Sequence, residues 1–202
     1  MTSLPMRDPT QDYLLTPENA ALLVIDYQPV QVASIASMDR RALMANAVAV
    51  VRAAKLYGMP IVLSTVNVTS GRNAPTVGRL RELLPDVRAV DRTSIDSWED
   101  GDFVAAVRAT GRRKLVVLAL WTEACLAFAA LGAMHDGFEV YPVVDAVGGT
   151  SREAHEAGLS RVVQAGAQPV SWVQLLCELQ RDWERESTVK EFAEILFSVV
   201  GQ

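Results

Sequence analysis

The sequence has few of the residues from which metal sites and disulfide frameworks are built. Its 202 residues include only two cysteines and two histidines. So few of them in a chain of this length argue against both a disulfide framework and a Cys/His metal cage. We therefore expect a reducing compartment, the cytoplasm, and we expect no disulfide, no metal and no other cofactor.

Long apolar runs and an excess of positive charge are also missing. The longest apolar stretches, residues 115–121 and 125–134, are shorter than the roughly 18 to 20 residues that span a bilayer. The formal net charge is −5, and the basic residues are scattered along the chain. Neither a membrane nor nucleic acid is therefore an expected partner.

What the sequence does contain is a regular alternation of two kinds of segment. Short β-branched or aliphatic runs recur about every 25 to 40 residues, the length of a strand plus a crossover helix. Several runs are continuously apolar, as in strands buried on both faces of a parallel sheet. The pattern predicts an α/β fold, a doubly wound open parallel sheet of about six strands with helices on both faces. The predicted strands are residues 21–25, 61–65, 87–90, 115–119, 140–144 and 169–171.

Helical periodicity fills the gaps between these strands. Predicted helices over residues 102–110, 122–136 and 151–165 each end at a glycine. Thr150 and Glu153 have the spacing of a capping box for the last of them. No linker or repeat divides the chain, so we expect one domain over residues 1–202 with a helical C-terminal extension. Because half of the residues are apolar, we also expect a homo-oligomer.

Candidate site residues are sought at the carboxyl ends of the strands, where open parallel sheets bind their ligands. Asp26 directly follows a buried aliphatic run, and desolvation there suits a general base. An aspartate that caps a turn is the alternative. Gln28 is a candidate for orienting this carboxylate or contacting substrate.

A cysteine follows the fourth predicted strand. With Thr122 as N-cap, Cys125 falls in the first turn of a helix, where free backbone N–H groups and the helix dipole lower the pKa of a thiol. The same N–H groups are able to hold an oxyanion. A small buried core cysteine is the alternative, and Cys177, which lies away from any strand end, is expected to be structural.

The third predicted strand runs into a polar segment, residues 91–100, that is long enough to cross the crevice. Arg92 in this segment would place a permanent cation beside Asp26 and Cys125, although an arginine after a strand is often part of a surface ion pair. Trp98 is a candidate substrate contact. Asn67 is another, since it begins a predicted loop over the crevice, residues 67–77.

These strand-end motifs resemble the isochorismatase-like cysteine hydrolases. The resemblance rests on Asp26, on the Thr-Glu-Ala-Cys motif of residues 122–125 and on residues 135–146, and it covers about residues 18–183. It extends to a bacterial branch with an Arg-Thr-x-x-x-x-Trp-Glu-Asp segment before the cysteine helix, here residues 92–100. The resemblance implies the doubly wound fold, a hydrolase activity and closed oligomers.

The resemblance also implies a triad of Asp, Lys and Cys in which the cysteine attacks a carbonyl and forms a thioester intermediate. Asp26 and Cys125 match this triad, whereas no lysine lies at the end of the third strand. Arg92 is the nearest cation, and Asp91 is the alternative if the register shifts by one residue. The three lysines are elsewhere in the sequence, at Lys55, Lys114 and Lys190.

Three further features follow from the resemblance. The Leu120–Trp121 peptide bond is expected to be cis, and the backbone N–H groups of Trp121 and Cys125 are expected to form the oxyanion hole. Nicotinamidase-type members bind a metal through several His and Asp. His135 and His155 are both predicted on helices away from the site, so no metal is expected.

We therefore predict a cofactor-free cysteine hydrolase of a small amide-like or related acyl C–N substrate. One alternative keeps the fold and uses the aspartate as a general acid to cleave a vinyl ether, as isochorismate-cleaving members do. The other is a non-catalytic, redox-sensing protein in which Cys125 is only a reactive thiol.

Overall fold

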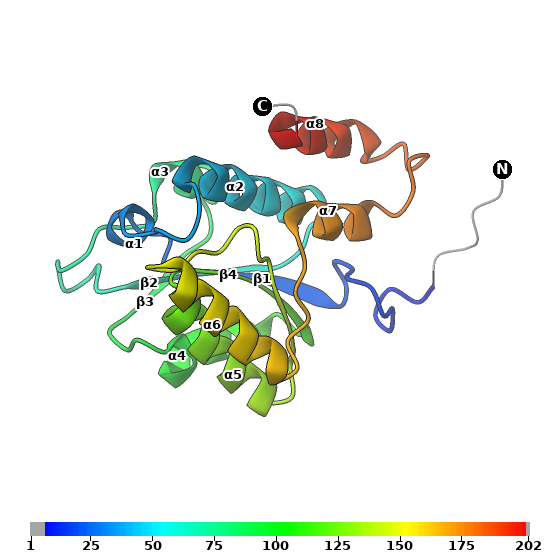
Figure 1. Ribbon diagram of the computed structural model, residues 1–202. Helices are drawn as coiled ribbons and strands as arrows, with labels where there is room; N and C mark the ends of the chain where they lie inside the picture. The colour runs from blue at the N-terminus through cyan, green and yellow to red at the C-terminus, as the bar shows by residue number, and fades with distance from the viewer. Residues whose placement is uncertain (1–6, 201–202) are drawn as a thin grey trace.

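A computed structural model describes residues 7–200 of the chain, with side chains for residues 7–198. Five parallel strands form one sheet in the order β3-β2-β1-β4-β5, and helices cover both of its faces (Figure 1). The predicted doubly wound parallel sheet is therefore confirmed, with five strands where about six were expected. The strands are β1 (Ala20–Ile25), β2 (Ile61–Val66), β3 (Ala89–Arg92), β4 (Lys114–Ala119) and β5 (Glu139–Pro142).

The sixth predicted strand, residues 169–171, is reduced to a single bridge between Val143 and Val170. Pro169 has no N–H to donate to a sheet ladder, and Ser171 already serves as the N-cap of the next helix. The segment is therefore too short to form a strand.

The helices form a layer on each side of the sheet (Figure 1). One layer contains α1 (Pro29–Ala33), α2 (Arg40–Leu56), α3 (Gly78–Arg81), α7 (Trp172–Gln180) and α8 (Val189–Val200). The other contains α4 (Gly101–Ala109), α5 (Ala127–His135) and α6 (Arg152–Gln164). Two short helical turns, η1 (Ser97–Glu99) and η2 (Thr122–Leu126), complete the described elements.

Each strand contributes to two hydrophobic cores because successive side chains point to opposite faces of a sheet. In β1, Leu22 and Val24 pack with α2 and α7, whereas Leu23 and Ile25 pack with α4 and α5. Every residue of β1 is buried, as expected of the central strand. This explains why its sequence is continuously apolar.

The N-terminus of α6 differs from the prediction by one residue. The Oγ of Ser151, rather than that of Thr150, accepts the hydrogen bond from the backbone N–H of Ala154, at 3.0 Å. Thr150 instead donates from its N–H and its hydroxyl to the carboxylate of Glu123. The predicted capping box is therefore wrong, because a tertiary contact takes Thr150 away from the helix.

The order of the strands indicates where the ligand crevice lies. The chain builds outward from β1 to β2 and β3, then returns to the other side of β1 to add β4 and β5. The carboxyl ends of β1 and β4 therefore flank the point where the strand order reverses. In the part of the chain that the structure describes, no helix is long and apolar enough to cross a membrane.

Candidate active site

Asp26 is the first residue after β1 and lies at this reversal point. Its side chain is fully buried, and its backbone adopts a φ of 59°. That region of φ is uncommon for residues other than glycine, although Asp and Asn enter it more readily than most. The backbone N–H of Asp26 donates to the carbonyl of Ser64 at 3.1 Å, which holds the turn against β2.

Arg92 reaches Asp26 across an intervening strand. Its Nη1 and Nη2 donate to the two carboxylate oxygens of Asp26, at 2.8 and 2.7 Å, and neither side chain has any solvent exposure. Neighbouring strands lie about 4.8 Å apart, so β3 and β1 are separated by roughly 10 Å. Only a long side chain spans that distance, and the planar guanidinium matches a carboxylate at two points.

The Arg92 guanidinium also donates hydrogen bonds to two backbone carbonyls. Nη1 also donates to the carbonyl of Thr65, and Nη2 to that of Ile95, each at 3.2 Å. The buried Nε has no hydrogen-bond partner within the described chain. Burial lowers the pKa of Arg92, but the hydrogen bonds and charge of Asp26 more than offset this and raise it, so the side chain remains a cation.

Asp91 points away from this cluster because side chains alternate along a strand. Its carboxylate accepts hydrogen bonds from the N–H groups of Val68 and Thr69 and from the hydroxyl of Thr65. Burial raises the pKa of Asp91, but these hydrogen bonds outweigh it and lower the pKa to about 2. Of the two register alternatives, Arg92 therefore faces Asp26, and Asp91 anchors the loop that follows β2.

Cys125 lies in η2, a π-helical turn of the kind often found at functional sites, and is 7% exposed. Asp26, Arg92 and the backbone N–H of Trp121 lie close enough to the thiol to act on its pKa. Burial and the charge of Asp26 raise the pKa of Cys125 to about 12, although Arg92 and the Trp121 N–H act in the opposite direction. The predicted lowering of this pKa by the helix terminus is therefore wrong.

Trp121 joins β4 to this turn. The Leu120–Trp121 peptide bond is cis, which confirms the expectation from the resemblance. Trp121 is also the N-cap of η2, in place of the predicted Thr122. Its indole Nε1 donates to the hydroxyl of Ser34 at 2.6 Å, which ties the segment after β4 to the end of α1. No feature of the local sequence around Ser34 pointed to this contact.

Gln28 is fully buried, and its amide binds backbone atoms rather than facing a crevice. Its Nε2 donates to the carbonyls of Val66 and Ala74, at 3.0 and 2.7 Å, and its Oε1 accepts from the N–H of Val66 at 2.9 Å. The structure therefore makes Gln28 an anchor of the loop over residues 67–77. It does not support the expectation that Gln28 contacts substrate.

Asn67 begins the same loop, as predicted, with a φ of 62°. Its N–H donates to the carbonyl of Arg92 at 2.8 Å, and its carbonyl accepts from the N–H groups of Arg72 and Asn73. The other end of the loop is held by the N–H of Val77, which donates to the carbonyl of Tyr27. A substrate contact by Asn67 stays a prediction.

Trp98 packs between helices. A Cβ added at Gly132 of α5 would lie 2.6 Å from the Trp98 ring, and the ring meets Phe103 and Phe138 edge to face. Its Nε1 donates to the carboxylate of Asp136, just beyond the C-terminal end of α5. These contacts assign Trp98 to the packing of α4 and α5, so the structure does not support its predicted contact with substrate.

The two histidines lie in different settings. His135 is exposed at the end of α5, whereas Nδ1 of His155 lies 2.8 Å from the hydroxyl of Thr122, three residues before Cys125. The expectation that both histidines lie away from the site is wrong for His155. Among the residues that the structure describes, no three or more His, Cys, Asp and Glu side chains are grouped to hold a metal ion.

A cavity of about 920 Å³ lies beside the edge strand β3. It is bordered by the loop over residues 67–77 and by residues 81–91, and Asp91 and Thr65 form part of its wall. Asp26, Arg92 and Cys125 do not line it. The cavity is therefore separate from the cluster of catalytic candidates.

The chain is similar to known proteins over most of its length. The model of the isochorismatase domain matches residues 20–174. The probable hydrolase YcaC of Escherichia coli K12 is 35% identical over 179 residues, which cover 88% of this chain and 86% of that protein.

Two solved structures share the fold over most of this chain. One is the E. coli YcaC crystal structure, described as an octameric hydrolase of unknown specificity. The other is YcaC from Pseudomonas aeruginosa with hexane-2,5-diol and covalent acrylamide. Each has a TM-score of 0.82 and 30% identity, and covers 94% of this chain and 98% of its own.

Proposed function

The chain is a hydrolase of the isochorismatase family, and we propose that it hydrolyses a small amide or related acyl C–N bond with Cys125 as nucleophile. The main support for this proposal is the buried cluster in which Asp26 lies near the Cys125 thiol while Arg92 holds both oxygens of that carboxylate. A nucleophile, an adjacent base and a group that orients the base are the components of nucleophilic catalysis. No cofactor is needed for this chemistry.

In the first step, the Cys125 sulfur attacks the substrate carbonyl carbon while its proton passes to Asp26. Because the pKa of Cys125 is about 12, the thiol is protonated at neutral pH, and the proton transfer must accompany the attack. The S–C bond forms and the carbonyl electron pair moves to oxygen. We assign the backbone N–H groups of Trp121 and Cys125 to this oxyanion.

In the second half of the reaction, the C–N bond breaks and Asp26 gives its proton to the leaving amine. A water molecule then attacks the thioester, with Asp26 taking the water proton and returning it to the departing Cys125 sulfur. Arg92 keeps its charge throughout because a guanidinium does not deprotonate in a protein. Its role is to hold the Asp26 carboxylate and to provide a fixed positive charge beside the thiol.

This mechanism predicts a transient acyl adduct on Cys125. The test is to incubate the protein with a library of small amides, quench with acid and measure intact and peptide masses. We expect an acyl mass on Cys125 that is absent from Cys125→Ser. The exposed Cys177 offers a matched control, because Cys177→Ser should keep both the adduct and the turnover.

Two other results would contradict the proposal. Hydrolysis of a vinyl ether by Cys125→Ser would indicate chemistry that uses Asp26 without the thiol. A protein that hydrolyses no member of the library and changes mass at Cys125 only with peroxide would be the redox-sensing alternative. In the cytoplasm, which we propose as its compartment, Cys125 stays reduced between turnovers.

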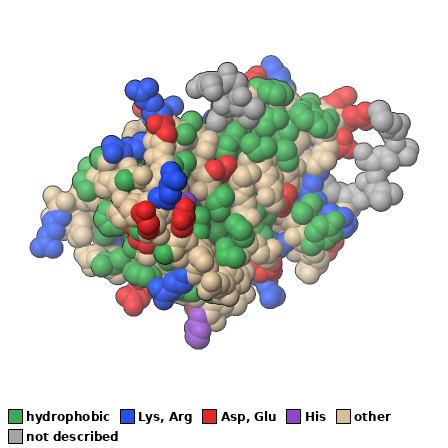
Figure 2. Space-filling model, in the orientation of Figure 1, with side chains coloured by type: hydrophobic (Ala, Val, Ile, Leu, Met, Phe, Trp, Pro, Cys, Tyr) green, Lys and Arg blue, Asp and Glu red, His purple; other side chains and the backbone are tan. Residues whose placement is uncertain are grey.

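The chain is further proposed to assemble with copies of itself. E. coli YcaC is described as octameric, and hydrophobic side chains gather on the surface over α7 and α8 of this chain (Figure 2). Trp183, between α7 and α8, and Phe197 of α8 are each 62% exposed. Light scattering should give a mass several times 22.0 kDa, and a particle of 22.0 kDa at micromolar concentration would contradict assembly.

A further inference from the structure

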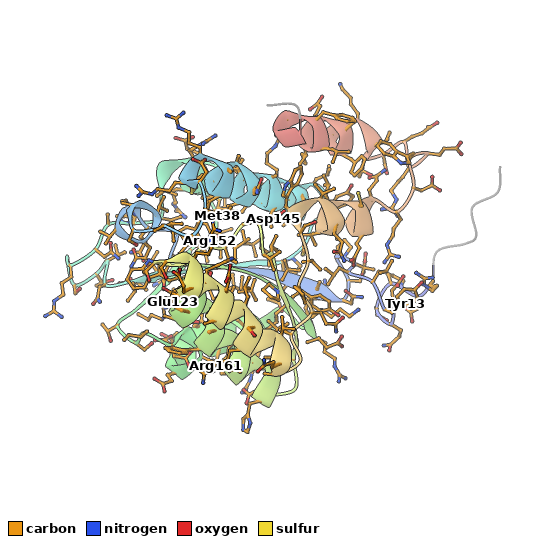
Figure 3. All side chains as sticks on the ribbon, viewed as in Figure 1. Tyr13, Met38, Glu123, Asp145, Arg152 and Arg161 are labelled. Carbon is orange, nitrogen blue, oxygen red and sulfur yellow. The ribbon has the colours of Figure 1, made fainter. Side chains whose placement is uncertain are left out.

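Helix α6 presses its backbone directly against the turn that carries Cys125. A Cβ added at Gly158 would lie 2.9 Å from the Cα of Glu123 and 3.0 Å from the carbonyl oxygen of Thr122. The Glu123 side chain lies against the N-terminal end of α6 (Figure 3), where its carboxylate binds Thr150. No space separates α6 from η2, so a side chain on this face of α6 acts directly on the turn.

His155 is the side chain of α6 that makes a polar contact with this turn. Its ring is half-buried, and Nδ1 lies 2.8 Å from Oγ1 of the fully buried Thr122. When the ring is neutral with its proton on Nε2, Nδ1 accepts the hydroxyl proton of Thr122. Burial lowers the pKa of His155, with the carboxylates of Glu123 and Glu156 opposing, and this keeps the ring neutral at neutral pH.

Thr122 links this contact to the reacting atoms. It directly follows Trp121, whose backbone N–H lowers the pKa of the Cys125 thiol, and its own N–H donates to the carbonyl of Gly148 at 2.9 Å. The N–H of Trp121 is also the donor that we assign to the oxyanion. A shift of the Thr122 backbone moves the Trp121–Thr122 peptide, which is attached to the residue that carries that donor.

We propose that His155 is a positioning residue for the nucleophile turn: its hydrogen bond to Thr122 holds the backbone that aims the Trp121 N–H at Cys125. The proposal rests on the proposed function only for its effect on turnover. Its effect on the Cys125 thiol follows from the contacts alone and is measurable without a substrate.

The test compares His155→Ala, His155→Asn and His155→Gln by the rate at which iodoacetamide alkylates Cys125 at mildly alkaline pH. The amide of asparagine reaches the position of Nδ1, whereas that of glutamine reaches the position of Nε2. If the Trp121 N–H is no longer held toward the sulfur, the thiol pKa should rise and alkylation should slow about two- to tenfold. We expect this loss in the alanine and glutamine variants and recovery in the asparagine variant.

Thr122→Val removes the same hydrogen bond from the other side. We expect the same slowing, and no further slowing when it is combined with His155→Ala, because the two changes delete one interaction. His135→Ala is the matched control, since this exposed histidine lies at the far end of α5.

The positioning role would be overturned if all three His155 variants alkylated at Cys125 as fast as the unchanged chain and had the same melting curves. Equal slowing in all three variants would also overturn it, because it would indicate packing rather than the Nδ1 contact. If the unchanged chain alkylates at Cys125 but hydrolyses no amide, the proposed function fails while the comparison of rates still decides the role of His155. With an active substrate, we expect His155→Ala to lower kcat and leave KM nearly unchanged.

Discussion

Asp26→Asn is expected to lower amide turnover by about 10²–10⁴-fold while making Cys125 more reactive toward iodoacetamide. The two effects have opposite signs because Asp26 has two roles. As a base it carries each proton of the reaction, and its loss slows turnover. As a buried negative charge it raises the pKa of Cys125, so its loss lowers that pKa and increases the thiolate fraction.

The measurement is a pair of rates on the same folded sample: amide turnover, and alkylation of Cys125 as a function of pH. The alkylation profile should shift to lower pH in Asp26→Asn. Because this variant leaves the Arg92 cation buried without its partner, Asp26→Asn/Arg92→Gln serves as a charge-neutral comparison. A variant that keeps full turnover, or whose alkylation profile shifts to higher pH, would contradict the assigned role of Asp26.

Arg92→Ala is expected to destabilise the fold by about 3–5 kcal/mol. Both side chains of the Asp26–Arg92 pair have zero exposure, so removing the cation leaves a buried carboxylate without its two strongest hydrogen bonds. The free energy of unfolding in urea measures this loss. Arg113→Ala is the matched control, because Arg113 is 79% exposed and its ion pair with Glu139 is long, at 3.7 Å.

Arg92→Ala should also slow alkylation of Cys125, because the Arg92 charge lowers the pKa of the thiol. This effect is the reverse of that expected for Asp26→Asn. Arg92→Lys restores the charge but not the two-point contact with Asp26. We expect it to recover most of the alkylation rate and only part of the stability. Equal unfolding free energies for Arg92→Ala and Arg113→Ala would show that the buried pair contributes nothing.

The sequence by itself determined the fold class and two of the three catalytic candidates. Strands buried on both faces must be continuously apolar, so β1, β2 and β4 were visible as aliphatic runs. Ligands bind at the carboxyl ends of such strands, so Asp26 after β1 and Cys125 after β4 were found from their positions in the chain. Both conclusions needed only local pattern and one rule of topology.

The partners of those residues were decided only by the tertiary structure. Whether Arg92 or Asp91 faces Asp26 depends on how the short strand β3 lies against β2, since a shift of one residue reverses every side chain. The local helix terminus predicted a low pKa for Cys125, but burial and the charge of Asp26, 99 positions earlier in the chain, outweigh it.

Contacts between segments that are distant in the sequence also explain the other differences between the predicted and observed roles of side chains. Gln28 and Trp98 have residue types that suit a binding site, yet their hydrogen bonds and ring contacts are used by a loop and by a helix that fold against them. His155 lies on a helix that the sequence predicted, but its approach to Thr122 depends on the absence of a side chain at Gly158. Composition and periodicity describe each segment alone, whereas a side chain's role here depends on segments that reach it only after the chain has folded.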